Sequence, residues 1–260
     1  MKNSKKVLLL LAAVAMMPSA FAWNRFGHEV VIKVAERHLT ERARAQIARY
    51  MPYDLKTDAV WMDNHRRDKE IAYTTAWHVY HVDENHEYDP NPRLSKGDIM
   101  TGMRTADYNL GRYERLTDSA VLMNLRMVLH FVGDMHCPTH SYFPGPRCFW
   151  PCSLNGKPQK AFHYVYDRMP EMLFRDVAAE EVAERIDTLD EAAIEKIQQG
   201  TFLDWIRDCG DNNCAIYEWN PFNTEELDPN TVELSRELVT VQLRNAGYRL
   251  ALLLNRYFDR

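Results

Sequence analysis

The chain lacks a long apolar run anywhere after its first 17 residues, which argues against a membrane-spanning helix in the body of the protein. Segments in which apolar and polar residues alternate are also missing, and their absence argues against a β-sandwich or a β-barrel. No internal repeat or low-complexity segment is found. The apolar residues recur instead at helical spacing, and this pattern predicts an all-α single domain of packed helices.

The chain also lacks an excess of positive charge. Its 32 Lys and Arg residues face 37 Asp and Glu residues, and three of the lysines precede residue 7. Without those three the balance is 29 to 37, a net charge of −8. A protein of this charge is not a general binder of polyanions, so a nucleic-acid substrate would require local positive charge or bound metal.

Cysteine is scarce, and the five residues present contain no CxxC pair. This spacing argues against a cysteine-rich zinc site. An exported protein can keep disulfides, and the local pairs Cys148–Cys152 and Cys209–Cys214 are our prediction, with Cys137 left over. The sequence alone does not determine this connectivity.

The first 22 residues have the three parts of a secretory signal peptide. Three lysines precede an apolar run at 7–17, and Ala20-Phe21-Ala22 is a typical cleavage site. We therefore predict an exported protein, periplasmic or secreted, whose mature chain starts at Trp23 and forms one domain over residues 23–260. An uncleaved membrane anchor is the alternative, but the apolar run is short for one.

Helical spacing of apolar residues marks six segments. The segment 118–131 is the most apolar and is expected to be a buried central helix. The last helix is expected to start at Asp228-Pro229 and to bury Leu234, Leu238, Val241, Tyr248 and Leu252. The other helices are expected at 29–39, 40–50, 99–113 and, as one helix or two, at 187–209.

Histidine and aspartate recur at metal-ligand spacing. His130 and Asp134 lie four residues apart at the end of the apolar helix, and His163 and Asp167 repeat that spacing. A carboxylate on a buried helix is costly unless it is paired, and a bound cation would pair it. Taken singly, each pair is also compatible with an ordinary hydrogen-bonded couple.

Five motifs follow one another along the chain. The central one, His130-Phe131-Val132-Gly133-Asp134-Met135-His136-Cys137-Pro138-Thr139-His140, is highly specific. The other motifs, in order along the chain, are Trp23 to His28, Trp61 to Arg66, Trp77-His78 and His163 to Asp167. An amino-terminal Trp created by signal cleavage is a rare feature. The complete set of motifs resembles the S1/P1 nucleases, which are zinc-dependent secreted nucleases.

The resemblance implies a phospholipase C/P1 nuclease-like fold and three Zn²⁺ ions. The first ion would be held by Asp63, His78, His130 and Asp134. The second would be held by His140, His163 and Asp167. The third would be held by His28, Asp134 and the free amine and carbonyl of Trp23, so that Asp134 bridges two ions and only the mature chain completes the third site.

The resemblance also implies an endonuclease that hydrolyses phosphodiesters of single-stranded DNA or RNA with a metal-activated hydroxide. It leaves open a 3′-nucleotidase activity. Asp63 would orient the nucleophile, and Arg66 would stabilise charge on the phosphate. His136 lies within the central motif but is not a ligand, and one interpretation is that it forms hydrogen bonds to the ligands from behind. Tyr80 and His81 are candidates for the wall of the cleft, although a core position is the more ordinary expectation. The protein is expected to be a monomer without stable membrane insertion.

The chain departs from the family between His140 and His163. Where the nucleases carry a Gly-Gly-Asn stretch tied to base binding, this chain has residues 145–152, Gly-Pro-Arg-Cys-Phe-Trp-Pro-Cys. The departure concerns substrate recognition, and it leaves open a zinc-dependent phospholipase C. The short spacing from Trp23 to His28 and the presence of Asp167 favour the nuclease. A non-catalytic metal-binding protein is a third class, disfavoured because every ligand position of an open site is filled.

Overall fold

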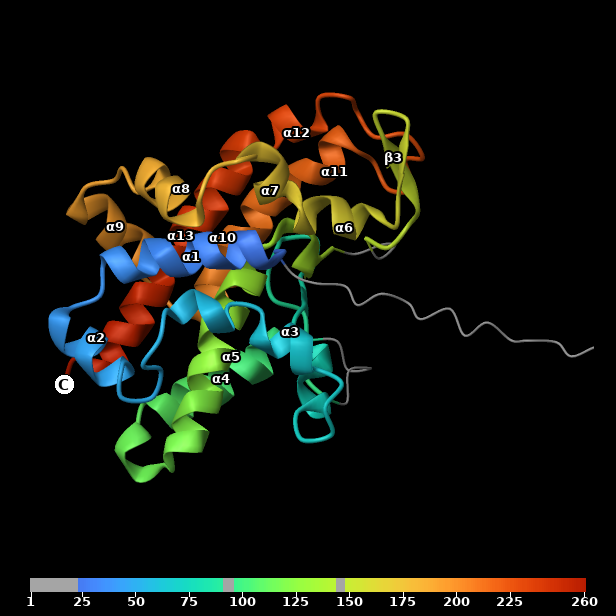
Figure 1. Ribbon diagram of the computed structural model, residues 1–260. Helices are drawn as coiled ribbons and strands as arrows, with labels where there is room; N and C mark the ends of the chain where they lie inside the picture. Colours follow the sequence, from blue (N-terminus) through green and yellow to red (C-terminus); the bar gives the residue numbers. More distant parts are fainter. Residues whose placement is uncertain (1–22, 91–95, 144–147) are drawn as a thin grey trace, which may run out of the picture.

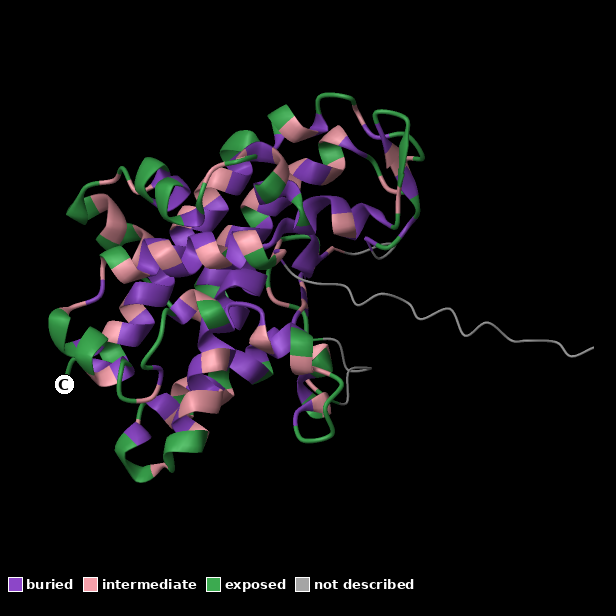
Figure 2. Ribbon diagram, in the orientation of Figure 1, coloured by how far each residue is buried: buried purple, intermediate pink, exposed green. Residues whose placement is uncertain are grey.

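Three long helices meet in the middle of the molecule and carry its core. In this computed structural model, which describes residues 23–90, 96–143 and 148–260, they are α1 (Arg25–Arg37), α5 (Asp118–His136) and α13 (Arg236–Phe258). Figure 1 shows α1 (blue) crossing α5 (green) and α13 (red). The buried residues gather on these same three helices in Figure 2. The expected signal peptide lies outside the described residues.

Shorter helices surround the three long ones. Below α1 in Figure 1, α4 (Ile99–Leu110) packs along α5. The helix α8 (Ala179–Ile186) packs on α1, and α9 (Glu191–Gln198) packs on α13. The remaining α-helices are α2 (Glu41–Ile47), α3 (Trp61–His65), α6 (Phe162–Asp167), α7 (Met169–Leu173), α10 (Phe202–Asn213), α11 (Ala215–Trp219) and α12 (Thr231–Leu234). Within the described residues, 3₁₀ turns lie at η1 (Leu55–Asp58), η2 (Ala72–Ala76), η3 (Tyr113–Arg115) and η4 (Pro138–His140).

The strands are few and short. β1 (Tyr80–His81) pairs in parallel with β2 (Ser141–Tyr142), and β3 (Cys152–Leu154) pairs antiparallel with β4 (Lys157–Gln159). The prediction of an all-α domain is therefore confirmed in its architecture, with these two small ladders added. The β1–β2 ladder joins the segments that follow His78 and His140, two of the predicted metal ligands.

Capping side chains mark where several predicted helices begin. Thr117 accepts a hydrogen bond from the Ala120 amide at the start of α5, and Thr40 does the same for Ala43 in α2. The helix predicted at 29–39 starts earlier, because Asn24 caps α1 through the Gly27 amide. Each predicted segment contains a helix, although the boundaries shift by several residues.

The predicted start of the last helix at Asp228-Pro229 is wrong. A short helix, α12, comes first, and α13 begins only at Arg236. Asp228 accepts a hydrogen bond from the Asn230 amide, which closes a turn in the chain before α12. Leu234, expected in the core, belongs to α12 and is 40% exposed, whereas Leu238 and Tyr248 are buried as expected.

The predicted disulfides are also wrong, because all five cysteines are free thiols. Cys209 lies inside α10 and Cys214 ends it, and residues five apart on a helix project in directions about 140° apart. The Cys148 thiol contacts the Tyr217 hydroxyl instead of Cys152, and Cys152 is fixed in the β3–β4 ladder.

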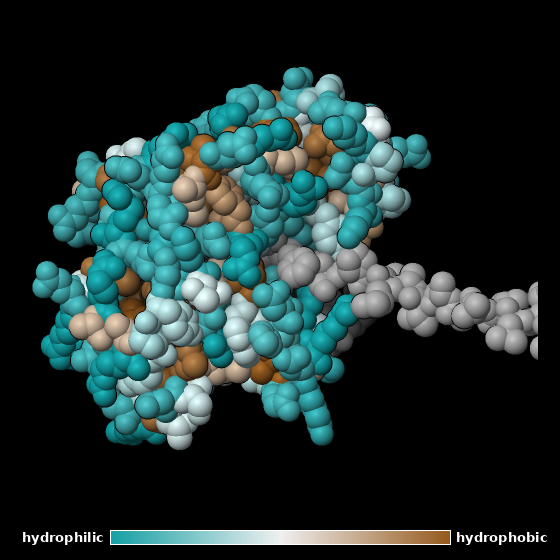
Figure 3. All heavy atoms as spheres, in the orientation of Figure 1, coloured by the Kyte–Doolittle hydropathy of each residue, from teal (hydrophilic) through white to brown (hydrophobic). Residues whose placement is uncertain are grey.

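The surface in view is polar. On the face shown in Figure 3, hydrophilic side chains cover most of the surface, and hydrophobic ones lie in small separate spots. Within the described residues, no helix combines the length and the apolar character that crossing a bilayer requires.

Close contact between α1 and α13 depends on Gly247. A Cβ atom built on Gly247 would lie 2.4 Å from the Val34 Cβ and 3.1 Å from the Val31 carbonyl oxygen. Distances this short mean that α13 can lie against α1 only because this position has no side chain.

We predict that Gly247→Ala destabilises the fold although alanine favours helices. Helix propensity gains about 1 kcal/mol, but overpacking costs typically about 1–3 kcal/mol, and here the clash involves backbone as well as a branched side chain. The expected result is a lower denaturation midpoint in urea. Thr240→Ala, at a half-buried position of the same helix, should stay within about 0.5 kcal/mol of the parent. An unchanged midpoint for Gly247→Ala would contradict the packing argument.

Candidate metal centre

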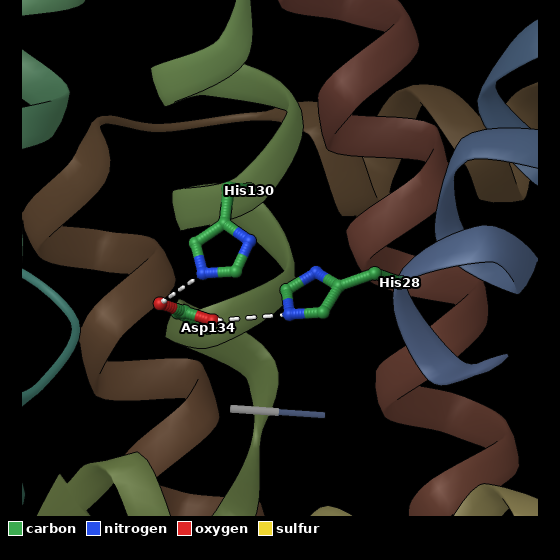
Figure 4. Close-up of side chains that lie close together, drawn as sticks. All are labelled: His28, His130 and Asp134. Atoms are coloured by element: carbon green, nitrogen blue, oxygen red, sulfur yellow. Dashed lines mark ion pairs between the residues drawn. The ribbon is translucent and has the colours of Figure 1, made fainter. Parts of the chain in front are cut away.

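One buried carboxylate, that of Asp134, faces three imidazoles. His130 lies one turn before it on α5, and His130 Nε2 is 3.3 Å from Asp134 Oδ2. His28 on α1 approaches the other oxygen, with Nε2 3.3 Å from Oδ1. Figure 4 shows these two imidazoles converging on the carboxylate from the green and blue helices. His78 Nδ1 is 2.9 Å from Oδ2, and all four side chains are buried.

The approach of α1 to α5 depends on Gly133. A Cβ at Gly133 would lie 2.6 Å from His28 Nδ1. In its absence the His28 ring stacks on the His130 ring, with centroids 4.2 Å apart and planes 16° apart. The glycine of the central motif therefore makes room for a histidine that lies more than 100 residues away in sequence.

Asp63 adds a second carboxylate to the same cluster. Its oxygens lie 3.6 Å from His78 Nδ1 and 3.7 Å from His130 Nε2. The Asp63 side chain comes from α3, and Arg126 of α5 contacts both this helix and the turn before it. Arg126 donates to Asp58 of η1 at 2.7 Å, and its guanidinium lies 4.1 Å from the ring centroid of Trp61, the first residue of α3.

His140, His163 and Asp167 form a second group beside the first. Asp167 Oδ1 lies 3.5 Å from His163 Nε2 and 3.8 Å from His140 Nε2. The two imidazole rings stack with centroids 4.8 Å apart. Trp23 and Asn24 lie close by: Trp23 is fully buried, and the Asn24 amide donates to the Asp167 carbonyl at 2.7 Å.

Backbone carbonyls fix the orientation of two of these rings. His130 Nδ1 lies 2.9 Å from the Ala59 carbonyl oxygen, and His140 Nδ1 lies 2.5 Å from the His78 carbonyl oxygen. A ring that donates from Nδ1 carries its lone pair on Nε2, the atom that faces the cluster in both cases. This is the arrangement typical of metal-ligating histidines.

Burial keeps most of these histidines neutral. It lowers the pKa of His130 and His163 well below the usual range and that of His140 to about 4. The pKa of His78 is raised instead. Burial lowers it, but the hydrogen bond and the negative charge of Asp134 outweigh the effect of burial. A neutral imidazole is the form that binds a metal.

Two of the three carboxylates lack the positive charge that would favour their ionised form. Burial raises the pKa of Asp63 to about 6 although His78 partly offsets it, and burial with nearby Asp63 and Asp134 raises that of Asp167 well above its usual range. Burial also opposes the charge on Asp134, but the imidazoles around it hold its pKa well below the usual range. A divalent cation would reverse the shifts of Asp63 and Asp167.

Several polar atoms of the two groups are buried without a hydrogen-bond partner. They include both nitrogens of His28 and His163, both oxygens of Asp63, His140 Nε2 and Asp167 Oδ2. Buried nitrogen and oxygen atoms that lack a hydrogen-bond partner are expected where an ion binds. Among the described residues, three sets have ligand atoms that all lie within 4.8 Å of one another: His28, His130 and Asp134; Asp63, His78 and His130; and Cys137, His140 and Asp167. The residues therefore fit a cluster of cations.

The structure brings together the side chains of the predicted ligands. Arg66 lies at the edge, with its guanidinium 3.7 Å from Asp63 Oδ1. The hydrogen bonds of His136 lead to other partners than the ligands. Its ring lies between the Val132 carbonyl and Arg249, which in turn pairs with Asp208. Burial and the charge of Arg249 lower the pKa of His136 to about 3. Tyr80 is core, with its hydroxyl donating to the Met135 carbonyl at 2.9 Å.

Two residues near the cluster were missed in the sequence. Cys137 lies at the second group, and Phe149 stacks on the His163 ring with centroids 4.5 Å apart. Cys137 lies within the central motif, so its position between Asp134 and His140 was a usable signal. Phe149 lies 14 residues before His163, and no spacing rule connects the two.

We predict that Gly133→Ala weakens metal binding while helical circular dichroism remains unchanged. The added methyl displaces His28 from Asp134, and loss of an orienting or ligating partner weakens metal affinity by about 10–100-fold or more. Titration with a divalent metal measures this. Gly111→Ala, at the end of α4 and remote from the cluster, is the control and should bind metal like the parent. Equal affinity in both variants would contradict the proposed role of the close approach.

Comparison with known proteins identifies the family of the chain. The S1/P1 Nuclease family model matches residues 23–259. The chain is 25% identical to Endonuclease 4 of Arabidopsis thaliana over an alignment that covers 96% of this chain and 94% of that protein. It is 23% identical to Endonuclease 1 of the same plant, with coverage of 99% and 95%. The chain therefore belongs to the S1/P1 nuclease family and is a hydrolase of that type.

Proposed function

We propose that this protein is a zinc-dependent phosphodiesterase that cleaves single-stranded nucleic acid. The observation that carries the proposal is the buried Asp134 carboxylate facing three imidazoles, beside a second group of histidines and aspartate. Imidazole nitrogen and carboxylate oxygen are the usual ligands of catalytic zinc. Family membership supplies the reaction class, and the donor set supports the choice of metal.

The proposed ligand assignment is the one that the family resemblance implies, and the two groups support it. Asp63, His78, His130 and Asp134 would hold one ion, and His140, His163 and Asp167 a second. A third ion would take His28 and Asp134 together with the amine and carbonyl of Trp23. That site requires cleavage after Ala22 during export, and the match to the family begins at residue 23, which supports this start of the mature chain.

The chemistry divides between the ions and the chain. Zinc ions would supply Lewis acidity, which acidifies water and polarises a phosphoryl oxygen. Asp63 accepts a hydrogen bond from the attacking water and orients it. Arg66, whose positive charge lies close enough to favour ionisation of Asp63 and Asp167, stabilises the negative charge that develops on the phosphate.

An aromatic side chain beside the cluster favours a single-stranded substrate. Phe149 is 40% exposed, and one face of its ring covers the His163 imidazole. Exposed aromatic rings stack on the unpaired bases of single strands, and this contact tolerates different sequences. A phospholipid is the competing substrate. Because the net negative charge of the chain disfavours binding of a polyanion, the test includes a phospholipid.

The experiment uses mature protein that starts at Trp23. Bound zinc is counted by elemental analysis, and hydrolysis of single-stranded DNA, RNA and phosphatidylcholine is followed side by side, before and after a chelator. We expect about three zinc ions per chain, since each ion takes three or four protein ligands, and nucleic-acid cleavage that the chelator abolishes. Cleavage of lipid alone would overturn the substrate; chains without zinc would overturn the site.

We predict that Arg66→Ala lowers turnover by about 10²–10³-fold, the usual effect of removing one group that stabilises transition-state charge. The zinc content should stay full, because Arg66 is not a ligand. Arg67→Ala, one position further along and exposed, is the matched control and should keep the turnover of the parent. Unchanged turnover in Arg66→Ala would remove this residue from the reaction.

A further inference from the structure

The buried thiol of Cys137 lies among the donors of the second group. Cys137 follows the last residue of α5 and precedes Pro138, so it stands between Asp134 and His140 in the chain. Its side chain is fully buried. Its sulfur and the ligand atoms of His140 and Asp167 all lie within 4.8 Å of one another.

The partners of this thiol are distant. Cys137 Sγ lies 3.7 Å from Thr139 Oγ1 and 4.0 Å from Asp167 Oδ1, the outer range for a hydrogen bond to sulfur. On the other side of the group, the Nε2 atoms of His140 and His163 have no hydrogen-bond partner. Two unpartnered imidazole nitrogens and a weakly bound thiol therefore surround the same carboxylate.

We propose that Cys137 is a fourth protein ligand of the ion held by His140, His163 and Asp167. Zn–S bonds of about 2.3 Å and Zn–N or Zn–O bonds of about 2.0–2.2 Å give donor separations of about 3.3–3.7 Å in a tetrahedral site. The measured separations from Asp167 Oδ1 are 3.5 Å to His163 Nε2, 3.8 Å to His140 Nε2 and 4.0 Å to Cys137 Sγ. From Asp167, the distance to Cys137 therefore exceeds this range by only a few tenths of an ångström.

This ligand changes the character of the second ion. When the bond to sulfur forms, the thiol proton leaves to solvent, and the resulting thiolate balances the divalent charge together with Asp167. Four protein donors make a closed site of the kind that holds zinc permanently. A thiolate also favours zinc over magnesium or manganese, which prefer oxygen donors. The inference rests on the proposed function, because it requires metal at the second group.

X-ray absorption at the zinc edge tests the inference directly. In mature protein loaded with zinc, we expect a sulfur shell at about 2.3 Å. Cys137→Ser should remove this shell and lower the affinity for one zinc ion by about 100-fold or more, since loss of a hydrogen-bond partner of a ligand alone lowers metal affinity by about 10–100-fold. Cys209→Ser is the matched control: Cys209 is equally buried, and its sulfur lies 3.7 Å from Gln242 Oε1 and 4.0 Å from Arg249. That variant should keep the shell.

The outcomes separate this inference from the proposed function. A fully loaded, active protein whose spectrum shows only nitrogen and oxygen neighbours would overturn the ligand role of Cys137 and leave the nuclease intact. A sulfur shell that survives Cys137→Ser would overturn it as well. A mature chain that binds no zinc would overturn both. The wild-type spectrum decides the first case even if Cys137→Ser fails to fold.

Discussion

The burial of the Asp134 carboxylate among three imidazoles is the constraint on which the rest of the structure depends. A fully buried carboxylate is costly unless charged or hydrogen-bonding partners surround it. His130 comes from the same helix, but His28 and His78 come from distant segments. The fold must therefore press α1 against α5 and hold a loop over both. Gly133 permits the close approach of α1 to α5, and Gly247 permits that of α13 to α1.

The two short strands and the end of α5 extend this order to the second group. The β1–β2 ladder and the bond from His140 to the His78 carbonyl join the two groups through the backbone. On the far side of α5, Arg249 bridges His136 and Asp208 and so anchors the last turn of the helix. Cys137 and His140 follow directly after that turn. A rigid helix end thus fixes donors that lie on irregular chain.

Local signals in the sequence predicted much of this, and long-range contacts account for what they missed. Apolar spacing locates α4 and α5 well, since helix formation is local. The disulfide pairs were predicted from spacing alone. They do not form because the backbone around Cys209 is helical and because Cys148 contacts Tyr217. His136 looked like a partner of the ligands, yet its partner Arg249 lies 113 residues away.

The balance of charge at the two groups links the proposed metal centre to the stability of the fold. Asp63, Asp134 and Asp167 are all buried, while His130, His140 and His163 have pKa values shifted below the usual range. At neutral pH the imidazoles with lowered pKa values carry little positive charge, so the carboxylates repel one another unless cations intervene. Ions that bind only the folded chain would remove this repulsion and stabilise it by mass action. The architecture that concentrates the donors is therefore completed by what they bind.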